Sequence, residues 1–290
     1  MTHILITDSG VGGLSVVAYA ERFVRTHGVN APVQLTFANA APANDFGYNS
    51  MRTRDEKLET FDRFLRNVTQ RFAPDSIYVA CNTLSVLLPD TPFFANAPLP
   101  VEGIVETGTA LLLRELEAKA NSVAIIFGTQ TTIDAGTYPR LLIERGIDSS
   151  RIVSQACPGL ADTISEDREG SKTREEIRHW VRTAIEKMQD RDAPAIASLN
   201  CTHYGYRKEL FASAFDEEGI AAKVVNPNEL AVHDLFGETS EGAHRDATVR
   251  FVTRYAIPDA TIEALTFFLE SISPKTVAAM QQFELQPKLF

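Results

Sequence analysis

The chain has 290 residues, and its 38 acidic against 28 basic side chains give a formal net charge of −10 at pH 7. With 44% hydrophobic and 23% charged residues, it has the composition of an ordinary globular protein, and its length suits one large or two modest domains. The negative balance and the lack of a Lys/Arg run exclude a sequence-independent grip on nucleic acid or an anionic membrane, because phosphate binding requires clustered cations.

The three cysteines, Cys81, Cys157 and Cys201, are too few and too far apart for a disulfide framework. They also lack the paired short spacing of a zinc site, so we expect free thiols and no bound metal. The first residues lack the basic region of a signal peptide, and no apolar run approaches the roughly 18 residues of a membrane helix. We therefore expect a cytoplasmic protein in a reducing compartment.

Short apolar runs alternate with amphipathic stretches along the chain, which predicts an α/β fold with parallel sheets. Strands are predicted at 3–7, 33–37, 76–80, 122–127 and 195–199, and helices at 14–27, 50–72 and 106–118. A further helix is predicted to start at a capping box formed by Thr173 and Glu176. From about Gly242 onward the sequence mixes helical patterns.

The two halves of the chain repeat one layout. In the first half a strand runs into Asp8-Ser9-Gly10 and a later strand ends at Cys81; in the second, a strand runs into Gly128-Thr129 and a later strand ends at Cys201. The separations agree, 81 − 8 = 73 and 201 − 129 = 72. Because ligands of open α/β sheets bind beyond the carboxyl ends of strands, we predict that two facing halves bring both cysteines into one cleft.

Two thiols on opposite walls of a cleft limit the reactions that the protein could catalyse. An enzyme of disulfide exchange has its two cysteines close together in the sequence, unlike Cys81 and Cys201. A cysteine hydrolase could use Cys201 with His203 as its base, but Cys81 would then have no catalytic role. Racemisation at a carbon centre requires a base on one face and an acid on the other, which a thiolate and a thiol supply. Because a thiol has a pKa of about 8.5, a neighbour must lower it or take its proton. Asp8 and His203 are the candidates, although a helix cap and a core histidine are their structural alternatives.

A glycine-rich turn, Gly10, Gly12 and Gly13, precedes the first predicted helix. Backbone N–H groups at a helix start form a seat for an anion. The turn lacks the Lys-Ser/Thr of a P-loop, so a carboxylate suits it better than a polyphosphate. Cys157, which precedes a proline, is not followed by hydrogen-bonding residues as Cys81 and Cys201 are. It is interpreted as a buried residue without a catalytic role.

At these residues the sequence resembles the glutamate racemase family, within the cofactor-independent aspartate/glutamate racemase superfamily. The resemblance runs from about Ile4 to Tyr204 and is carried by Asp8-Ser9-Gly10-Val11-Gly12-Gly13, Cys81-Asn82-Thr83 and Cys201-Thr202-His203-Tyr204. It implies two pseudo-symmetric α/β domains with mainly parallel sheets, at 1–104 plus 212–290 and at 105–211, with the active site in the cleft between them. It also implies cofactor-independent interconversion of L- and D-glutamate, which supplies D-glutamate for peptidoglycan. Glutamate is the expected small-molecule partner, and a homodimer is an alternative to the monomer.

The resemblance also implies roles for individual residues. Cys81 and Cys201 would be the acid/base thiols, assisted by Asp8 and His203. Substrate would be held by Ser9, Phe46, Gly47, Asn82, Thr83, Thr132 and Thr202.

Several positions depart from the family pattern. Phe46 replaces the usual Tyr, Ala135 stands where Ser is usual, and Gly205 replaces a Pro. The family's acidic helper falls on Ser165, with Asp162 and Glu166 nearby. These departures leave two alternatives open: a racemase of aspartate or another small acidic substrate, and a catalytically silent amino-acid-binding or regulatory protein on the same fold.

Overall fold

The computed structural model describes residues 1–237 and 243–289, which form two compact units, Met1–Ile104 with Asn228–Phe290, and Val105–Pro227. Each unit is an α/β structure around one sheet, and the strands of both sheets run parallel, as the alternating pattern predicts. Within the described residues no helix is both long and apolar enough to cross a membrane.

The first unit contains a six-stranded sheet in the order β10-β9-β2-β1-β3-β4. Its strands are β1 (Thr2–Asp8), β2 (Val33–Asn39), β3 (Ser76–Val79), β4 (Val101–Gly103), β9 (Ala247–Thr253) and β10 (Glu284–Leu285). Ile4, Leu5 and Ile6 of the central strand β1 are all buried, because helices cover both faces of a parallel sheet.

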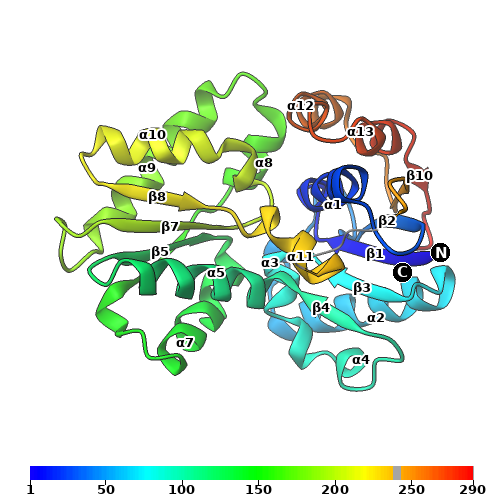
Figure 1. Cartoon of the computed structure of the whole chain (residues 1–290), viewed down its shortest axis with the longest axis horizontal. Helices are drawn as coiled ribbons and strands as arrows, with labels where there is room; N and C mark the ends of the chain where they lie inside the picture. The colour runs from blue at the N-terminus through cyan, green and yellow to red at the C-terminus, as the bar shows by residue number, and fades with distance from the viewer. Residues whose placement is uncertain (238–242, 290) are drawn as a thin grey trace. The chain divides into compact units, whose positions relative to one another are not determined.

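Helices lie on both faces of this sheet (Figure 1). They are α1 (Leu14–His27), α2 (Arg54–Phe72), α3 (Asn82–Ser85), α4 (Pro92–Ala95), α11 (Ala231–Phe236), α12 (Asp259–Leu269) and α13 (Pro274–Gln281), with short 3-10 helices η1 (Tyr48–Ser50), η2 (Leu88–Asp90) and η5 (Pro227–Glu229). Helix α2 starts later than its predicted first residue, 50, because the Thr53 hydroxyl accepts the N–H of Glu56 at 3.1 Å and so caps the helix there.

The second unit contains a four-stranded sheet in the order β6-β5-β7-β8. Its strands are β5 (Val123–Gly128), β6 (Ile152–Ala156), β7 (Ala195–Asn200) and β8 (Ala222–Val225). Its helices are α5 (Ile104–Ala118), α6 (Gln130–Asp134), α7 (Thr137–Glu144), α8 (Leu160–Glu166), α9 (Ser171–Glu186) and α10 (Lys208–Glu217), with η3 (Ser149–Arg151) and η4 (Tyr204–Arg207). Helices α9 and α10 pack side by side on one face, and α5 and α7 lie on the other (Figure 1).

The second unit extends further along the chain than the predicted division at residue 211. Strand β8 pairs in parallel with β7, so a boundary at 211 would separate two neighbouring strands of one sheet. In the structure this unit continues to Pro227, and the chain then returns to the first unit at Asn228.

The predicted capping box at Thr173 and Glu176 is wrong. Helix α9 begins at Ser171, so Thr173 lies within its first turn. The carboxylate of Asp167 accepts the Thr173 N–H at 2.8 Å and its hydroxyl at 2.9 Å, while Glu176 accepts from the hydroxyl of Thr163 at 2.8 Å. A side chain from the preceding loop therefore satisfies the helix start.

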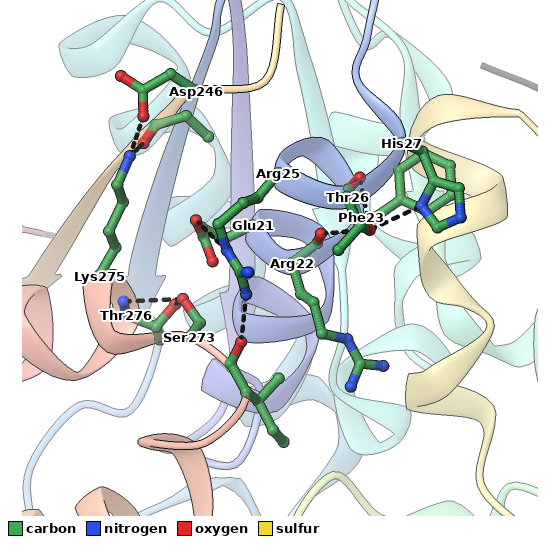
Figure 2. Close-up of polar contacts among 12 residues, drawn as sticks. Glu21, Arg22, Phe23, Arg25, Thr26, His27, Asp246, Ser273, Lys275 and Thr276 are labelled. Carbon is green, nitrogen blue, oxygen red and sulfur yellow. Dashed lines mark hydrogen bonds and ion pairs between the residues drawn. The ribbon is translucent and has the colours of Figure 1, made fainter. Parts of the chain in front are cut away.

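The chain beyond Gly242, a residue that itself lies outside the described part, completes the first unit. It adds the strand β9 beside β2, which the helical pattern did not predict, the helix α13, which packs on α1, and the helix α12, which packs on α13. Arg25 of α1 contacts this segment by donating to the carbonyl of Ile272 at 3.1 Å. Its guanidinium also pairs with Glu21 of the same helix at 3.5 Å (Figure 2).

Candidate active site

Cys81 lies directly after β3, at the first residue before the short helix α3, and is buried. A hydrogen bond of 3.0 Å joins its Sγ to the Oγ of Ser9, which follows the neighbouring strand β1. Asn82 and Thr83 form the start of α3 and are also buried. The parallel pairing of β1 with β3 is what brings these side chains to one edge of the sheet.

The surroundings of Cys81 favour its neutral form. Burial raises the pKa of the Cys81 thiol to about 12, and the nearby charge of Asp8 acts in the same direction. The hydroxyl of Ser9 and the backbone N–H groups of Ser9 and Leu84 oppose this rise, because they stabilise the thiolate. The thiol therefore needs a proton acceptor before it can act as a base.

Asp8, the last residue of β1, offers such an acceptor. It is 1% exposed, and its Oδ2 has no hydrogen-bond partner among the described residues. Space for this carboxylate depends on Gly13, where an added Cβ would come within 2.8 Å of both Cβ and Oδ2 of Asp8. The glycine turn thus makes room for a buried carboxylate beside a thiol.

The segment around Phe46 and Gly47 is partly exposed. The Phe46 side chain is 40% exposed, and open space surrounds Gly47. The neighbouring Tyr48 is buried instead, its ring packs edge-on to Phe61, and its hydroxyl has no hydrogen-bond partner among the described residues. Burial and the nearby Cys81 raise the pKa of the Tyr48 phenol. Sequence reasoning missed Tyr48; its only signal is its place directly after Phe46-Gly47.

In the second unit Cys201 lies directly after β7 and is buried. The Nδ1 of His203 is 3.9 Å from its Sγ, so an imidazole accompanies this thiol. The His203 ring also packs edge-on to Tyr206, with 6.4 Å between ring centroids. Thr202, between the thiol and the imidazole, is buried.

The turn after β5 faces the same sheet edge, since β5 pairs in parallel with β7. The hydroxyls of Thr129 and Thr132 are 3.0 Å apart, and Thr129 also accepts the N–H of Thr132 at 3.3 Å, which caps α6. Thr132 is buried, and Ala135 ends the same helix.

The strand that ends before Cys201 carries a buried polar residue, Asn200, that the sequence did not reveal. Asn200, the last residue of β7, and Tyr138 of α7 approach Gly108 of α5 closely. A Cβ at Gly108 would lie 2.7 Å from the Tyr138 hydroxyl and 3.2 Å from the Asn200 Nδ2. A glycine at this position of α5 is thus required for the packing of the strand that carries Cys201.

Two other candidates have structural partners. Cys157 is buried, and burial raises its pKa; the hydroxyl of Tyr204 donates to its carbonyl at 3.2 Å. The Ser165 hydroxyl donates to the carbonyl of Ala161 within α8 at 3.0 Å. Glu166, at the end of the same helix, is exposed.

Comparisons with known proteins agree with these features. No family model matches the chain. A glutamate racemase of Nitratiruptor sp. is 29% identical over 232 residues, which cover 79% of this chain and 81% of the relative. Among solved structures, glutamate racemase isoform RacE1 of Bacillus anthracis matches with a TM-score of 0.73 at 18% identity, covering 94% of this chain and 95% of the other. Glutamate racemase of Francisella tularensis, solved in complex with D-glutamate, matches with a TM-score of 0.67 at 20% identity, covering 94% and 95%.

The structural matches show a shared fold, and the chain is similar in sequence to relatives that are named glutamate racemase. Together they support the assignment of the chain to the glutamate racemase family.

Proposed function

We propose that this racemase interconverts L- and D-glutamate by a cofactor-independent mechanism in which Cys81 and Cys201 are the two acid/base groups. One observation carries the proposal: each unit presents a cysteine at the carboxyl end of a strand, with a proton acceptor close to it. Asp8 accompanies Cys81, and His203 accompanies Cys201 at 3.9 Å. Curated relatives named glutamate racemase supply the substrate class.

The proposed reaction moves one proton at a time. A thiolate removes the Cα proton and becomes a thiol, while the electron pair of the C–H bond stays on the substrate as a carbanion. The thiol on the opposite face donates its proton to Cα and becomes a thiolate, so the product has inverted configuration. The two sulfurs have now exchanged protonation states, and Asp8 and His203 return them by accepting and donating protons.

The substrate would be held by local dipoles. At a net charge of −10 the protein has no general attraction for glutamate, whose two carboxylates outnumber its one ammonium group. Hydroxyl, amide and backbone N–H groups of Ser9, Asn82 and Thr83 in one unit, and of Thr132 and Thr202 in the other, are suited to carboxylates and an ammonium. Phe46 and Gly47 are proposed to line the pocket, where the backbone N–H of Gly47 would be the polar group that binds the substrate. In this proposal D-glutamate is made for peptidoglycan, and the homodimer stays a prediction.

The test is exchange of the Cα proton in deuterium oxide. Purified protein, treated with EDTA and without pyridoxal phosphate, is incubated with L- or D-glutamate and followed by proton NMR and chiral chromatography. We expect loss of the Cα proton signal and formation of the opposite enantiomer from either starting material. Faster exchange on aspartate would transfer the same mechanism to the shorter substrate. Saturable glutamate binding without exchange would reject the proposal in favour of a silent binding protein.

A further inference from the structure

The loop that carries Cys201 packs against one buried side chain, that of Asn226. A Cβ at Gly205 would lie 2.3 Å from Nδ2 and 2.9 Å from Cγ of Asn226. Asn226 is 2% exposed and directly follows β8, the strand that pairs with β7. The Asn226 amide therefore lies directly on the backbone at Gly205, four residues after Cys201, in the space that a side chain would occupy.

Two residues later, the same stretch of chain contacts the glycine turn of the first unit. Asn228 is completely buried, and its Nδ2 donates to the hydroxyl of Ser15 at 2.9 Å. That hydroxyl donates in turn to the carbonyl of Gly12, also at 2.9 Å. Gly12 lies between Ser9, which is hydrogen-bonded to Cys81, and Gly13, which makes room for Asp8.

Asn226 and Pro227 are the last two residues of the second unit, and Asn228 opens the returning part of the first. We propose that these two asparagines are positioning residues, Asn226 for the loop of Cys201 and His203, and Asn228 for the turn of Asp8 and Ser9. The roles of the positioned residues rest on the proposed function. The segment Asn226-Pro227-Asn228 thus anchors the loop of Cys201 and the turn whose Ser9 is hydrogen-bonded to Cys81.

The physical chemistry favours such a role. A buried amide must keep its hydrogen bonds, because an unsatisfied buried polar group costs about 1–3 kcal/mol. Each asparagine therefore restricts the backbone against which it is packed. Pro227 restricts the segment further, since its ring fixes φ near −65°. Gly205 and Asn226 form a matched pair, because a side chain at residue 205 would collide with the Asn226 amide.

The first experiment is a double-mutant cycle on Gly205 and Asn226. Gly205→Ala should lower kcat for glutamate about tenfold, with a smaller change in KM, because the added Cβ displaces the Cys201 loop. Asn226→Ala removes the colliding atoms, so the double variant should be no slower than Asn226→Ala alone. Additive losses in the double variant would overturn the matched pair. If Gly205→Ala does not fold, Asn226→Asp, which keeps the shape but replaces the N–H donor, takes its place and should also lower kcat.

The second experiment reads each thiol without substrate. Alkylation by iodoacetamide is followed by peptide mass spectrometry at Cys81 and Cys201 over a range of pH. Asn226→Ala should change the rate at Cys201 at least threefold and leave Cys81 unchanged, whereas Asn228→Ala should do the reverse. Asn96→Ala, at an exposed asparagine of the first unit, is the matched control and should change neither.

These outcomes separate the two proposals. Equal effects of each variant on both thiols, or no effect on either, would overturn the positioning roles. A wild-type protein that exchanges no Cα proton would reject the proposed function, while the alkylation rates would still decide whether the asparagines position the thiols.

Discussion

Ser9 and Cys81 are joined by a 3.0 Å contact at the ends of two adjacent parallel strands. The register pairs Thr7 with Val79, which sets Ser9 opposite Cys81, 72 residues later in the chain (81 − 9). In the second unit Gly128 pairs with Asn200, which sets Thr129 opposite Cys201, also 72 residues later (201 − 129). The repeat therefore aligns Ser9 with Thr129, so that each unit has a hydroxyl side chain opposite its cysteine.

This register corrects the alignment by spacing and reveals an asymmetry. Asp8, which the spacing matched to Thr129, corresponds to Gly128, so the second unit has no carboxylate at that position. His203 is the titratable group near Cys201 instead. The two thiols thus have partners of different chemistry, a carboxylate and an imidazole, and are expected to respond differently to pH.

The first prediction concerns Asp8→Asn, which should move two properties of the protein in opposite directions. The Asp8 charge contributes to the raised pKa of Cys81, about 12, so its removal lowers that pKa and increases the thiolate fraction at pH 8. Alkylation of Cys81 should therefore become several-fold faster while that of Cys201 stays unchanged. Racemisation should fall about 10- to 100-fold, since the proton acceptor is lost. Slower alkylation of Cys81 would contradict the electrostatic role.

Ser9→Ala should have the opposite effect on the same thiol. The Ser9 hydroxyl lowers the pKa of Cys81, so its loss raises that pKa further. We expect alkylation of Cys81 to slow by about tenfold or more and kcat to fall with it, because a hydrogen bond to a charged group is worth about 1.5–3 kcal/mol and about 1.4 kcal/mol corresponds to a factor of ten. Rates over pH 7–10 measure this, and wild-type alkylation should still be rising at pH 10. A plateau below pH 9 would show that the Cys81 thiol is more acidic than its surroundings imply.

How much of this could be predicted from sequence depends on the range of the interactions. Strand ends and glycine turns are local patterns, so Cys81 after β3 and Cys201 after β7 were predictable, as was the parallel α/β fold. Tyr48 and Asn226 were not, because their burial follows from contacts distant in the chain. The capping box failed for the same reason: Asp167, outside the helix, satisfies the N–H of Thr173.

Strand β9 shows another limit of pattern reading. Its residues Ala247–Thr253 include Arg250, which interrupts the apolar run and obscures the strand. In the structure the Arg250 guanidinium forms two hydrogen bonds of 2.8 Å to Glu284 on the neighbouring β10. This ion pair also lowers the pKa of Glu284. The charged Arg250 within strand β9 is thus explained only by its partner Glu284, which lies 34 residues away in the chain.

The third prediction separates the three thiols by function. Cys81→Ser and Cys201→Ser should each lower racemisation at least 10³-fold, because a general acid/base group contributes about 10²–10⁴ in rate and a serine hydroxyl is a much weaker acid than a thiol. Cys157→Ala should stay within about threefold of wild type, with a modest loss of stability from the cavity it leaves. Chiral chromatography from both enantiomers gives the rates. Full activity of either serine variant would end the two-thiol mechanism.

The last prediction concerns the stability of the first unit. Arg25 is the ion-pair partner of Glu21, whose side chain is 2% exposed and whose Oε2 has no hydrogen-bond partner among the described residues (Figure 2). Arg25→Ala should therefore lower the free energy of unfolding by about 1–3 kcal/mol, because it leaves a buried carboxylate without its cation and frees the carbonyl of Ile272. Arg140→Ala breaks a pair with Glu144 at the same i,i+4 spacing, but both side chains are more than half exposed, at 59% and 54%, so it should change stability by less than about 0.5 kcal/mol. Urea unfolding of both variants measures the difference. Racemisation per folded molecule should stay at the wild-type level in each, and equal destabilisation by the two substitutions would contradict a special role for the ion pair of the buried Glu21.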